Sequence, residues 1–383
     1  MILFLLFKKL EMGEITIKDV KDEFKKWLYL EDTNFIDVVL ATAISEKEKG
    51  EPLWLFLIAP PGSTKTETIR SFAGDWFYTI DDLTSHTFIS GLTFGKKDKM
   101  NRDLLPLLDK KVLLIKDFTV VLEKNKDERK DILGQLRGIY DGYFEKKFGT
   151  KEAKISYNSR FGIIAGVTPV VDRYWKVMQQ LGERFLKYRI KLDRIKATST
   201  AYDNSGKEIQ MRKGMQEIVK KFINSLDFSR EIKFSDEKYK QTLIRLAEFV
   251  AIIRTPVSGG DEEFEYIPEP ELSTRLVKQL KKLAICLARV HKKEEVGNEE
   301  IEIIRQVCLD TSPPDRLMVL NEIRNGLIPD AEMIADAIGL TTGKTRLILA
   351  NLTRLGLIKL EKSALEKGGV SYGYCLNNEM EVN

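Results

Sequence analysis

The chain has 383 residues, of which 43% are hydrophobic, and this is enough for two or three packed domains. Three widely spaced cysteines (Cys286, Cys308 and Cys375) and only two histidines argue against a disulfide framework or a structural zinc site. No apolar run reaches the ~18 residues that a membrane span needs, and a net charge of +4 does not by itself indicate a nucleic-acid partner.

The first seven residues (MILFLLF) are apolar, but Lys8 and Lys9 follow them rather than precede them. A secretory signal peptide carries its positive charge before the apolar stretch, and that stretch is longer. We therefore expect a cytoplasmic protein that does not bind a membrane.

The first half of the chain predicts an α/β fold. Apolar residues have helical spacing over residues 20–47, and residues 53–58 (LWLFLI) then form a continuous apolar run. Similar runs lie at residues 112–115 (VLLI) and 161–165 (FGIIA). Such runs are typical of strands buried on both faces, so we predict a parallel sheet with helices on both sides.

The second half is predicted to be mainly helical. The helical pattern extends from residue 214 to residue 307, with clear helices at 239–253 and 276–290. The segment DTSPPD (residues 310–315) indicates a linker. Three helical stretches and two strand-like runs follow, and they predict a winged helix-turn-helix; they lie at residues 316–325, 331–338, 342–355, 357–360 and 370–376.

The segment APPGSTKT (residues 59–66) directly follows the first predicted strand. In a strand-loop-helix of this kind, backbone N–H groups wrap the phosphates of a nucleotide, a lysine adds a point charge, and a threonine hydroxyl helps to hold Mg²⁺. The strict pattern GxxxxGK[ST] is altered, because Ala59 and Thr64 replace its glycines. The alternative is an ordinary strand-turn-helix with a chance lysine. The candidate ATP-binding residues are Pro61, Gly62, Ser63, Thr64, Lys65, Thr66 and Glu67.

A second nucleotide element is the strand that ends in VLLIKDF (residues 112–118). A carboxylate at the end of such a strand holds Mg²⁺, together with Thr66, and a neighbouring acid usually activates water. Only Asp117 is present here, so two interpretations stay open. In the first, Asp117 is the carboxylate that holds the metal, and the residue that activates water is unassigned. In the second, Lys116 and Asp117 occupy the two positions of the acid pair, and Asp117 is the water-activating base, with a shorter side chain than the usual glutamate.

These motifs, in this order, resemble the motor half of the minichromosome maintenance (MCM) replicative helicases. They also resemble the compact MCM-like AAA+ proteins of phages, plasmids and integrated elements. YNSRFGIIAGVTP (residues 157–169) is similar to the hairpin-to-sensor segment of the family, and LGERF (residues 181–185) to its arginine-finger box. STRLVKQLKKLAICLARV (residues 273–290) is similar to its sensor-2 helix. The resemblance covers about residues 20–307.

The resemblance implies catalytic roles for Thr168, Arg184 and Arg275, beside Asp117. Thr168 stands where the family has its sensor-1 asparagine, Arg184 at the arginine finger, and Arg275 on the sensor-2 helix. A finger arginine from a neighbouring subunit stabilises charge on the transferring phosphoryl group, so hydrolysis would require an assembled ring, in this family a homo-hexamer. The alternative for each arginine is an ordinary surface salt bridge.

Candidate DNA-binding residues lie in three places. Residues 144–160 predict a β-hairpin with Lys147, Lys151 and Lys154, which in the family projects into the ring channel and contacts single-stranded DNA. A basic segment at residues 90–102 contains Lys96 and Lys97. The winged helix offers Lys344 and Arg346 to duplex DNA, although such a domain equally often binds a protein. The alternative for all of them is a solvated charged surface.

We therefore predict an α/β protein: an AAA+ P-loop core of three αβα layers with a helical lid and a C-terminal winged helix-turn-helix. The predicted segments are a helical lead-in (1–48), an ATPase core (49–205), a lid (206–310) and a winged helix (311–383). The predicted function is a ring-forming ATPase that uses ATP and Mg²⁺ as a DNA helicase or translocase in replication of a mobile element or virus. The alternatives are a non-translocating ATP-binding initiator or regulator, and an inactive ring subunit.

Overall fold

The computed structural model describes residues 15–89, 103–147, 154–180, 184–257, 269–325, 329–364 and 370–377. Within these residues the largest sheet has five parallel strands in the order β2-β3-β6-β1-β7. Because all five run in the same direction, their carboxyl ends lie along one edge and their amino ends along the other. The strands are β1 (Trp54–Ile58), β2 (Phe77–Ile80), β3 (Val112–Ile115), β6 (Gly162–Val167) and β7 (Phe185–Arg189).

Side chains of the central strands alternate between two separate cores. In β1, Trp54, Phe56 and Ile58 belong to one core, whereas Leu55 and Leu57 belong to the other. This alternation follows from the two-residue repeat of a strand. Both faces of the sheet are therefore covered, and the mixed α/β fold is compatible with a three-layer αβα arrangement.

The helices divide between the two faces. The core of Trp54 is closed by α5 (Leu105–Leu108), α6 (Thr119–Glu123), α7 (Lys126–Tyr140), the 3-10 turn η2 (Pro169–Tyr174) and α8 (Trp175–Gln180). The core of Leu55 is closed by α2 (Ile17–Trp27), α3 (Asn34–Ile44), α4 (Lys65–Arg70), α10 (Glu208–Ser225), α11 (Glu237–Ile253), α12 (Thr274–Val290) and α13 (Asn298–Thr311). The predicted lead-in, ATPase core and lid thus all contribute to this second core. The remaining elements here are η1 (Ser45–Lys47), α9 (Arg194–Asp203), β8 (Lys233–Phe234) and β9 (Glu295–Val296).

The three strands predicted from apolar runs are confirmed as β1, β3 and β6, and the helices predicted at 239–253 and 276–290 as α11 and α12. Strands β2 and β7 were not predicted. β2 is an edge strand that is only half-buried, and β7 (FLKYR) contains Lys187 and Arg189, so neither is a continuous apolar run.

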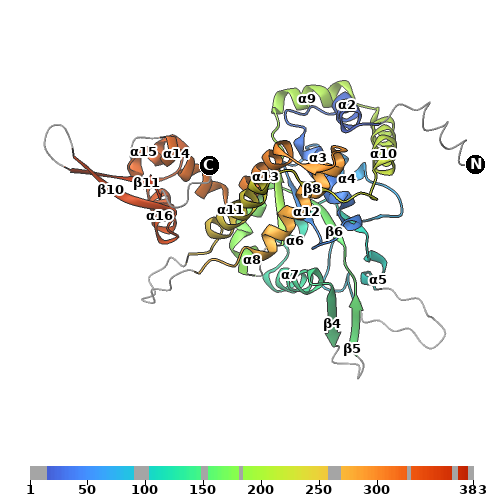
Figure 1. Cartoon of the computed structure of the whole chain (residues 1–383), viewed down its shortest axis with the longest axis horizontal. Helices are drawn as coiled ribbons and strands as arrows, with labels where there is room; N and C mark the ends of the chain where they lie inside the picture. Colours follow the sequence, from blue (N-terminus) through green and yellow to red (C-terminus); the bar gives the residue numbers. More distant parts are fainter. Residues whose placement is uncertain are drawn as a thin grey trace, which may run out of the picture.

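The predicted hairpin is also confirmed, as β4 (Tyr143–Lys147) paired antiparallel with β5 (Lys154–Asn158). It extends from the amino edge of the sheet, because β6 begins directly after it (Figure 1).

The C-terminal residues form a third core together with Ile253, the last residue of α11. Three helices, α14 (Pro314–Asn325), α15 (Ala331–Ile338) and α16 (Thr342–Arg354), pack against an antiparallel pair, β10 (Ile358–Ala364) and β11 (Val370–Leu376). Figure 1 shows this unit standing to one side of the sheet. The buried Arg316 ties it to the rest of the chain by donating to the carbonyls of Ile253 and Thr255.

None of the helices in the described ranges is both long enough and apolar enough to cross a bilayer.

A buried ionic network joins α2, α3, α12 and α13. The ring of His291 lies 2.6 Å from Glu300 and 3.3 Å from Asp37, and both carboxylates are fully buried. Burial alone would lower the pKa of His291, but the hydrogen bonds to Asp37 and Glu300 outweigh it and raise the pKa to about 9. Lys21 contacts Asp37, and Lys293 contacts both Glu299 and Glu300, so the group contains balanced charges.

The network predicts a pH dependence of stability. The folded pKa of His291 lies above the ordinary value of 6.5, so its contribution is complete below about pH 6.5 and is lost as the pH rises to about 9. The shift corresponds to about 3 kcal/mol of unfolding free energy. Denaturant titrations between pH 6.5 and 9 are expected to show this decline in the wild type and not in His291→Gln. His86→Gln, which changes the exposed second histidine, is the control and should keep the decline. An equal slope in His291→Gln would contradict the assignment.

Candidate functional site

Three of the predicted site segments meet at the carboxyl edge of the sheet. The loop at residues 59–64 leaves β1, Asp117 follows β3, and Thr168 follows β6. Because β6 pairs with both β1 and β3, with Ile58 beside Val167 and Ile115 beside Ala165, these three segments are neighbours. The sheet order thus brings together residues that are up to about a hundred positions apart in the sequence.

The loop between β1 and α4 is shaped to present backbone and hydroxyl groups. Gly62 has φ +72°, a left-handed conformation that favours glycine. Within the described part of the chain, the buried hydroxyl oxygens of Ser63 and Thr64 have no hydrogen-bond partner. Unpaired buried hydroxyls cost free energy unless a ligand pairs with them. The loop therefore has the properties of a site for a polar ligand.

Lys65 begins α4 and is 4% exposed. Its ammonium donates to the carbonyl of Pro60 at 3.0 Å, so the side chain folds back across the loop. Burial lowers the pKa of Lys65, and the nearby Asp117 carboxylate opposes that shift. A desolvated cation beside unpaired hydroxyls is a suitable partner for an anionic group such as phosphate.

Asp117 and Thr168 are linked through Thr119, a residue that no sequence motif marks. The backbone N–H of Thr119 donates to Asp117 Oδ1 at 2.9 Å. The Thr119 hydroxyl accepts from the backbone N–H of Thr168 at 3.0 Å and donates to the Thr168 hydroxyl at 3.3 Å. The proton of the Thr168 hydroxyl is not used in this pair and can be given to a ligand or a water molecule.

Lys116 does not take part in this arrangement. Its ammonium pairs with Asp81 at 2.7 Å, so the side chain is directed to the β2 side of the edge. Asp117 is therefore the acid of this segment that adjoins the loop.

Gly166 allows β3, β6 and α4 to approach one another closely. A Cβ at this position would lie 2.5 Å from the Lys116 carbonyl oxygen and 3.2 Å from a methyl group of Ile69. The backbone on either side of Asp117 and Thr168 can keep its spacing only if this residue is glycine.

We expect Gly166→Ala to lower the unfolding free energy by ~1–3 kcal/mol, the usual cost of overpacking, and to disturb the loop site. Denaturant unfolding and calorimetric titration with ATP would measure both effects. The matched control is Gly134→Ala on the exposed face of α7, where nothing lies within 4 Å of the new methyl group. The control should be stabilising by ~0.5–1 kcal/mol, because glycine is unfavourable inside a helix. Equal behaviour of the two variants would refute this role for Gly166.

Glu67 has a structural partner outside the loop. Its carboxylate accepts two hydrogen bonds of 2.8 Å from Arg212 on α10, and it also pairs with Arg70 at 3.1 Å. These bonds hold the pKa of Glu67 below its usual value in spite of burial. Of the predicted ATP-binding residues, Glu67 is thus the one that joins α4 to α10.

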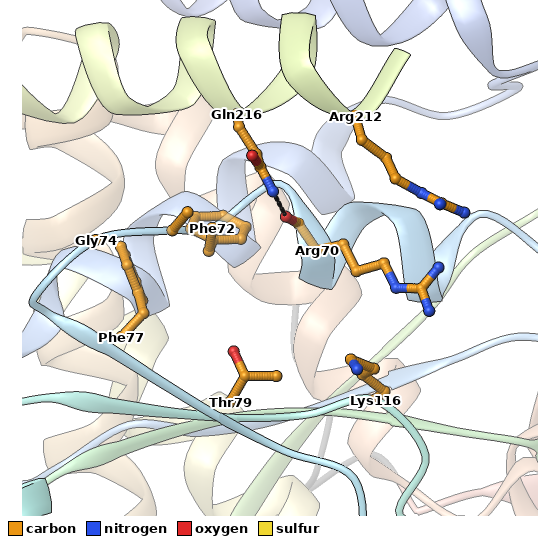
Figure 2. A pocket seen from close by; sticks show the side chains of 9 residues that line it. Arg70, Phe72, Gly74, Phe77, Thr79, Lys116, Arg212 and Gln216 are labelled. Carbon is orange, nitrogen blue, oxygen red and sulfur yellow. Dashed lines mark hydrogen bonds between the residues drawn. The ribbon is translucent and has the colours of Figure 1, made fainter. Parts of the chain in front are cut away.

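A cavity of about 390 Å³ lies beside this ion pair (Figure 2). Its cationic lining comes from Arg70, Lys116 and Arg212, and Phe72 and Phe77 form an apolar wall. Gln216 also lines it, and its amide donates to the carbonyl of Arg70. The cavity is bounded by α4, α10 and β2, and no residue of the loop 59–64 lines it.

Arg184 and Arg275 lie at the opposite edge of the sheet. Arg184 precedes β7, and the register places Phe185 beside Trp54, the first residue of β1. The loop follows the last residue of β1, so five residues at ~3.3 Å each separate the two positions by roughly 16 Å. Arg184 therefore cannot reach the loop of its own chain.

The two arginines share one aromatic ring. The guanidinium carbon of Arg184 lies 5.3 Å from the ring centroid of Tyr140, and that of Arg275 lies 5.9 Å from it. Arg184 also pairs with Asp141 at 3.7 Å. Burial and the charge of Arg275 lower the pKa of Arg184 to about 10. Arg184 is 6% exposed and Arg275 is half-buried, so two cations lie close together beside one ring at this edge of the sheet.

An aromatic column connects the two edges of the sheet. Tyr140 meets Trp54 at 5.0 Å, Trp54 meets Phe185 at 5.2 Å, and Phe185 stacks on Phe56 at 3.8 Å. Phe56 then meets Phe118 at 5.0 Å, and Phe118 follows Asp117. The column fills the core on the α7 side between the arginines and the carboxyl edge.

The predicted DNA-binding residues are only partly described. Lys147 and Lys154 are cross-strand partners at the end of the β4–β5 hairpin, and their side chains lie outside the described residues, as do Lys151, Lys96 and Lys97 entirely. Lys344 and Arg346 are exposed on α16. They have loose ion pairs, with Asp315 at 3.9 Å and with Glu332 at 3.4 Å.

No family model matches the chain, and no curated protein matches it significantly.

Proposed function

We propose that this chain is a ring-forming AAA+ ATPase of the MCM-like class that moves along DNA, with one ATP site formed between each pair of subunits. The observation that carries the proposal is the separation of the two halves of the site. Lys65, Asp117 and Thr168 gather at one edge of the sheet, and Arg184 and Arg275 at the other. In a head-to-tail ring, the arginine edge of one subunit faces the loop edge of the next.

The residues at the carboxyl edge suit a Mg²⁺–triphosphate. The backbone of residues 61–66 and the unpaired hydroxyls of Ser63 and Thr64 would bind phosphate oxygens, with Lys65 as the adjacent cation. Thr66 and Asp117 would hold Mg²⁺, which neutralises charge on the phosphates. Thr168, positioned by Thr119, would orient the attacking water through its hydroxyl proton.

The C-terminal unit supports a DNA-related function. Three helices followed by a two-stranded antiparallel sheet are the elements of a winged helix-turn-helix, and α16 would be its recognition helix. Lys344 and Arg346 are exposed on α16 and can exchange their loose ion pairs for phosphate contacts. In this proposal the ring channel takes single-stranded DNA through the hairpin, and the C-terminal unit takes duplex DNA or a protein.

The second candidate is an ATP-binding switch that hydrolyses slowly, such as a replication initiator. The residues at the carboxyl edge favour this candidate, because Asp117 is the acid next to the loop and the neighbouring position holds Lys116, which pairs with Asp81. Asp117 already accepts a hydrogen bond from Thr119, and no separate base is assigned. Under this candidate the protein would bind ATP and hydrolyse it slowly.

The deciding experiment is ATP hydrolysis by the purified protein with and without single-stranded DNA, together with unwinding of a forked duplex. The motor proposal expects turnover that DNA stimulates and ATP-dependent unwinding. Tight ATP binding without stimulated turnover would support the switch instead. Absence of ATP binding would refute both.

A further inference from the structure

A groove lined by many basic side chains lies at the amino edge of the sheet. It has a volume of about 960 Å³ and lies between α12, the turn after η1 and the segment at residues 228–234. Nine lysine or arginine side chains and three glutamates line it, an excess of six positive charges. The whole chain has a net charge of only +4, so positive charge is concentrated here.

Some of these cations stabilise the fold. Arg289 is buried and donates to Glu48 and to two backbone carbonyls. Lys282 is 3% exposed and lies 3.8 Å from Glu46 and 3.4 Å from the Gly50 carbonyl oxygen. These two residues form the floor of the groove and are committed to protein partners.

Other cations of the groove are available to a ligand. Lys49, Lys233 and Lys281 are exposed, and none of them has a carboxylate partner in the part of the chain that the structure describes. Lys278 is 62% exposed and has only a loose pair with Glu51 at 3.8 Å. Exposed cations without partners that face one concave surface attract a polyanion.

The available cations come from several segments around the groove. Lys278 and Lys281 lie one turn apart on the same face of α12, and the three steps between them span ~4.5 Å. Lys49 follows η1, and Lys233 lies in the segment at residues 228–234. Because the four lysines line one concave surface from three sides, a ligand with several phosphates can contact more of them than a single phosphate group can.

Two further features favour a nucleic acid over other polyanions. Phe228 and Phe234 line the groove and are partly buried. Lys47 and Arg289 already contact the ring of Phe228, at 4.8 and 5.2 Å from its centroid, so Phe234 is the ring proposed to stack with a base. Arg160, two residues after β5, also lines the groove and donates to the carbonyl of Gly50. The groove therefore begins at the base of the β4–β5 hairpin, the element predicted to contact DNA.

We propose that this groove binds single-stranded nucleic acid, as a continuation of the path that starts at the hairpin. Lys49, Lys233, Lys278 and Lys281 contact the phosphates, and Phe234 stacks with a base. This inference rests on the proposed function, and it adds a second contact surface outside the ring channel.

The test is a pair of double variants of the full-length protein with equal changes in charge. Lys49→Glu/Lys281→Glu alters the groove, and Lys213→Glu/Lys221→Glu alters exposed lysines of α10. Fluorescence anisotropy with a labelled oligonucleotide measures affinity across a salt series. Loss of two phosphate contacts should weaken binding by about 25-fold at ~0.1 M salt and reduce the salt-dependence slope by about 1.4. The control should bind as the wild type does.

Several outcomes would overturn the proposal that the groove binds single-stranded nucleic acid. One is a groove variant that binds the oligonucleotide as tightly as the wild type does, and another is a control variant that loses as much affinity as the groove variant. A third is a groove variant whose affinities for duplex and for single-stranded oligonucleotide fall equally. A fourth is a loss of self-association, measured by light scattering, in the groove variant alone. ATP binding by calorimetry, expected to be unchanged, verifies that the variant is folded. If the wild type hydrolyses no ATP but the groove variant still loses affinity, the motor proposal fails and the groove stands. DNA-stimulated hydrolysis with unchanged affinity in the groove variant would refute the groove and leave the motor proposal standing.

Discussion

Replacing Arg184 with alanine is expected to lower the rate of ATP hydrolysis by ~10³-fold or more while ATP binding is retained, because an arginine finger contributes ~10³–10⁵ in rate. The loop at residues 59–64 is intact in this variant, and Arg184 lies roughly 16 Å from it in the same chain. Steady-state turnover and calorimetric ATP titration measure the two quantities separately.

Two controls separate a catalytic from a structural loss. Arg184 is buried beside Tyr140, so Arg184→Lys, which keeps the charge, tests whether a cation alone maintains the fold. It should keep the unfolding free energy near that of the wild type and still lose most of the rate, since lysine lacks the planar fork of arginine. Arg245→Ala removes an exposed arginine of α11 and should change neither quantity. Equal turnover in Arg184→Ala and the wild type would exclude the finger.

Replacing Lys65 with alanine is expected to remove tight ATP binding. The lost hydrogen bond to a charged group is worth ~1.5–3 kcal/mol, or roughly 10- to 150-fold in the dissociation constant. The fold should not suffer, because Lys65 makes one bond to a carbonyl at 3.0 Å and its buried ammonium is costly to desolvate. Lys116→Ala is the matched control, since Lys116 pairs with Asp81 and lines the separate cavity of Figure 2. Unchanged ATP affinity in Lys65→Ala would remove the basis of the ATPase proposal.

Mixing the two inactive variants tests the shared site directly. In an equal mixture of Lys65→Ala and Arg184→Ala, about a quarter of the neighbouring pairs combine an intact loop with an intact arginine. Hydrolysis should therefore return in the mixture although each variant alone is inactive. A mixture without activity would contradict a site shared between neighbouring subunits.

The sequence predicted the parts of the fold that depend on local pattern. β1, β3 and β6 are continuous apolar runs, and continuous burial on both faces leaves that pattern in the sequence. β7 was missed because Lys187 and Arg189 interrupt its apolar residues. The lysine is nevertheless buried, and its backbone N–H donates to Thr311 of α13, a contact from 124 positions away.

The candidate site residues were proposed one by one from the sequence, but their arrangement relative to one another could not be. Lys65 and Asp117 follow from short motifs, whereas the separation of Arg184 from them depends on strand order and register. Tyr140 and Thr119 had no motif to mark them, since each acts through a side chain brought near by the sheet. The contacts of Glu67 with Arg212 likewise join residues 145 positions apart, which no local pattern reveals.

The aromatic column from Tyr140 to Phe118 bears on how force could pass through such a molecule. Rings in contact at 3.8 to 5.2 Å leave no room for compression, and a packed core resists deformation much as an organic crystal does. The core between Asp117 and the arginine pair therefore resists compression. A movement of one edge of the sheet would then be passed to the other edge through these rings, rather than being absorbed between them.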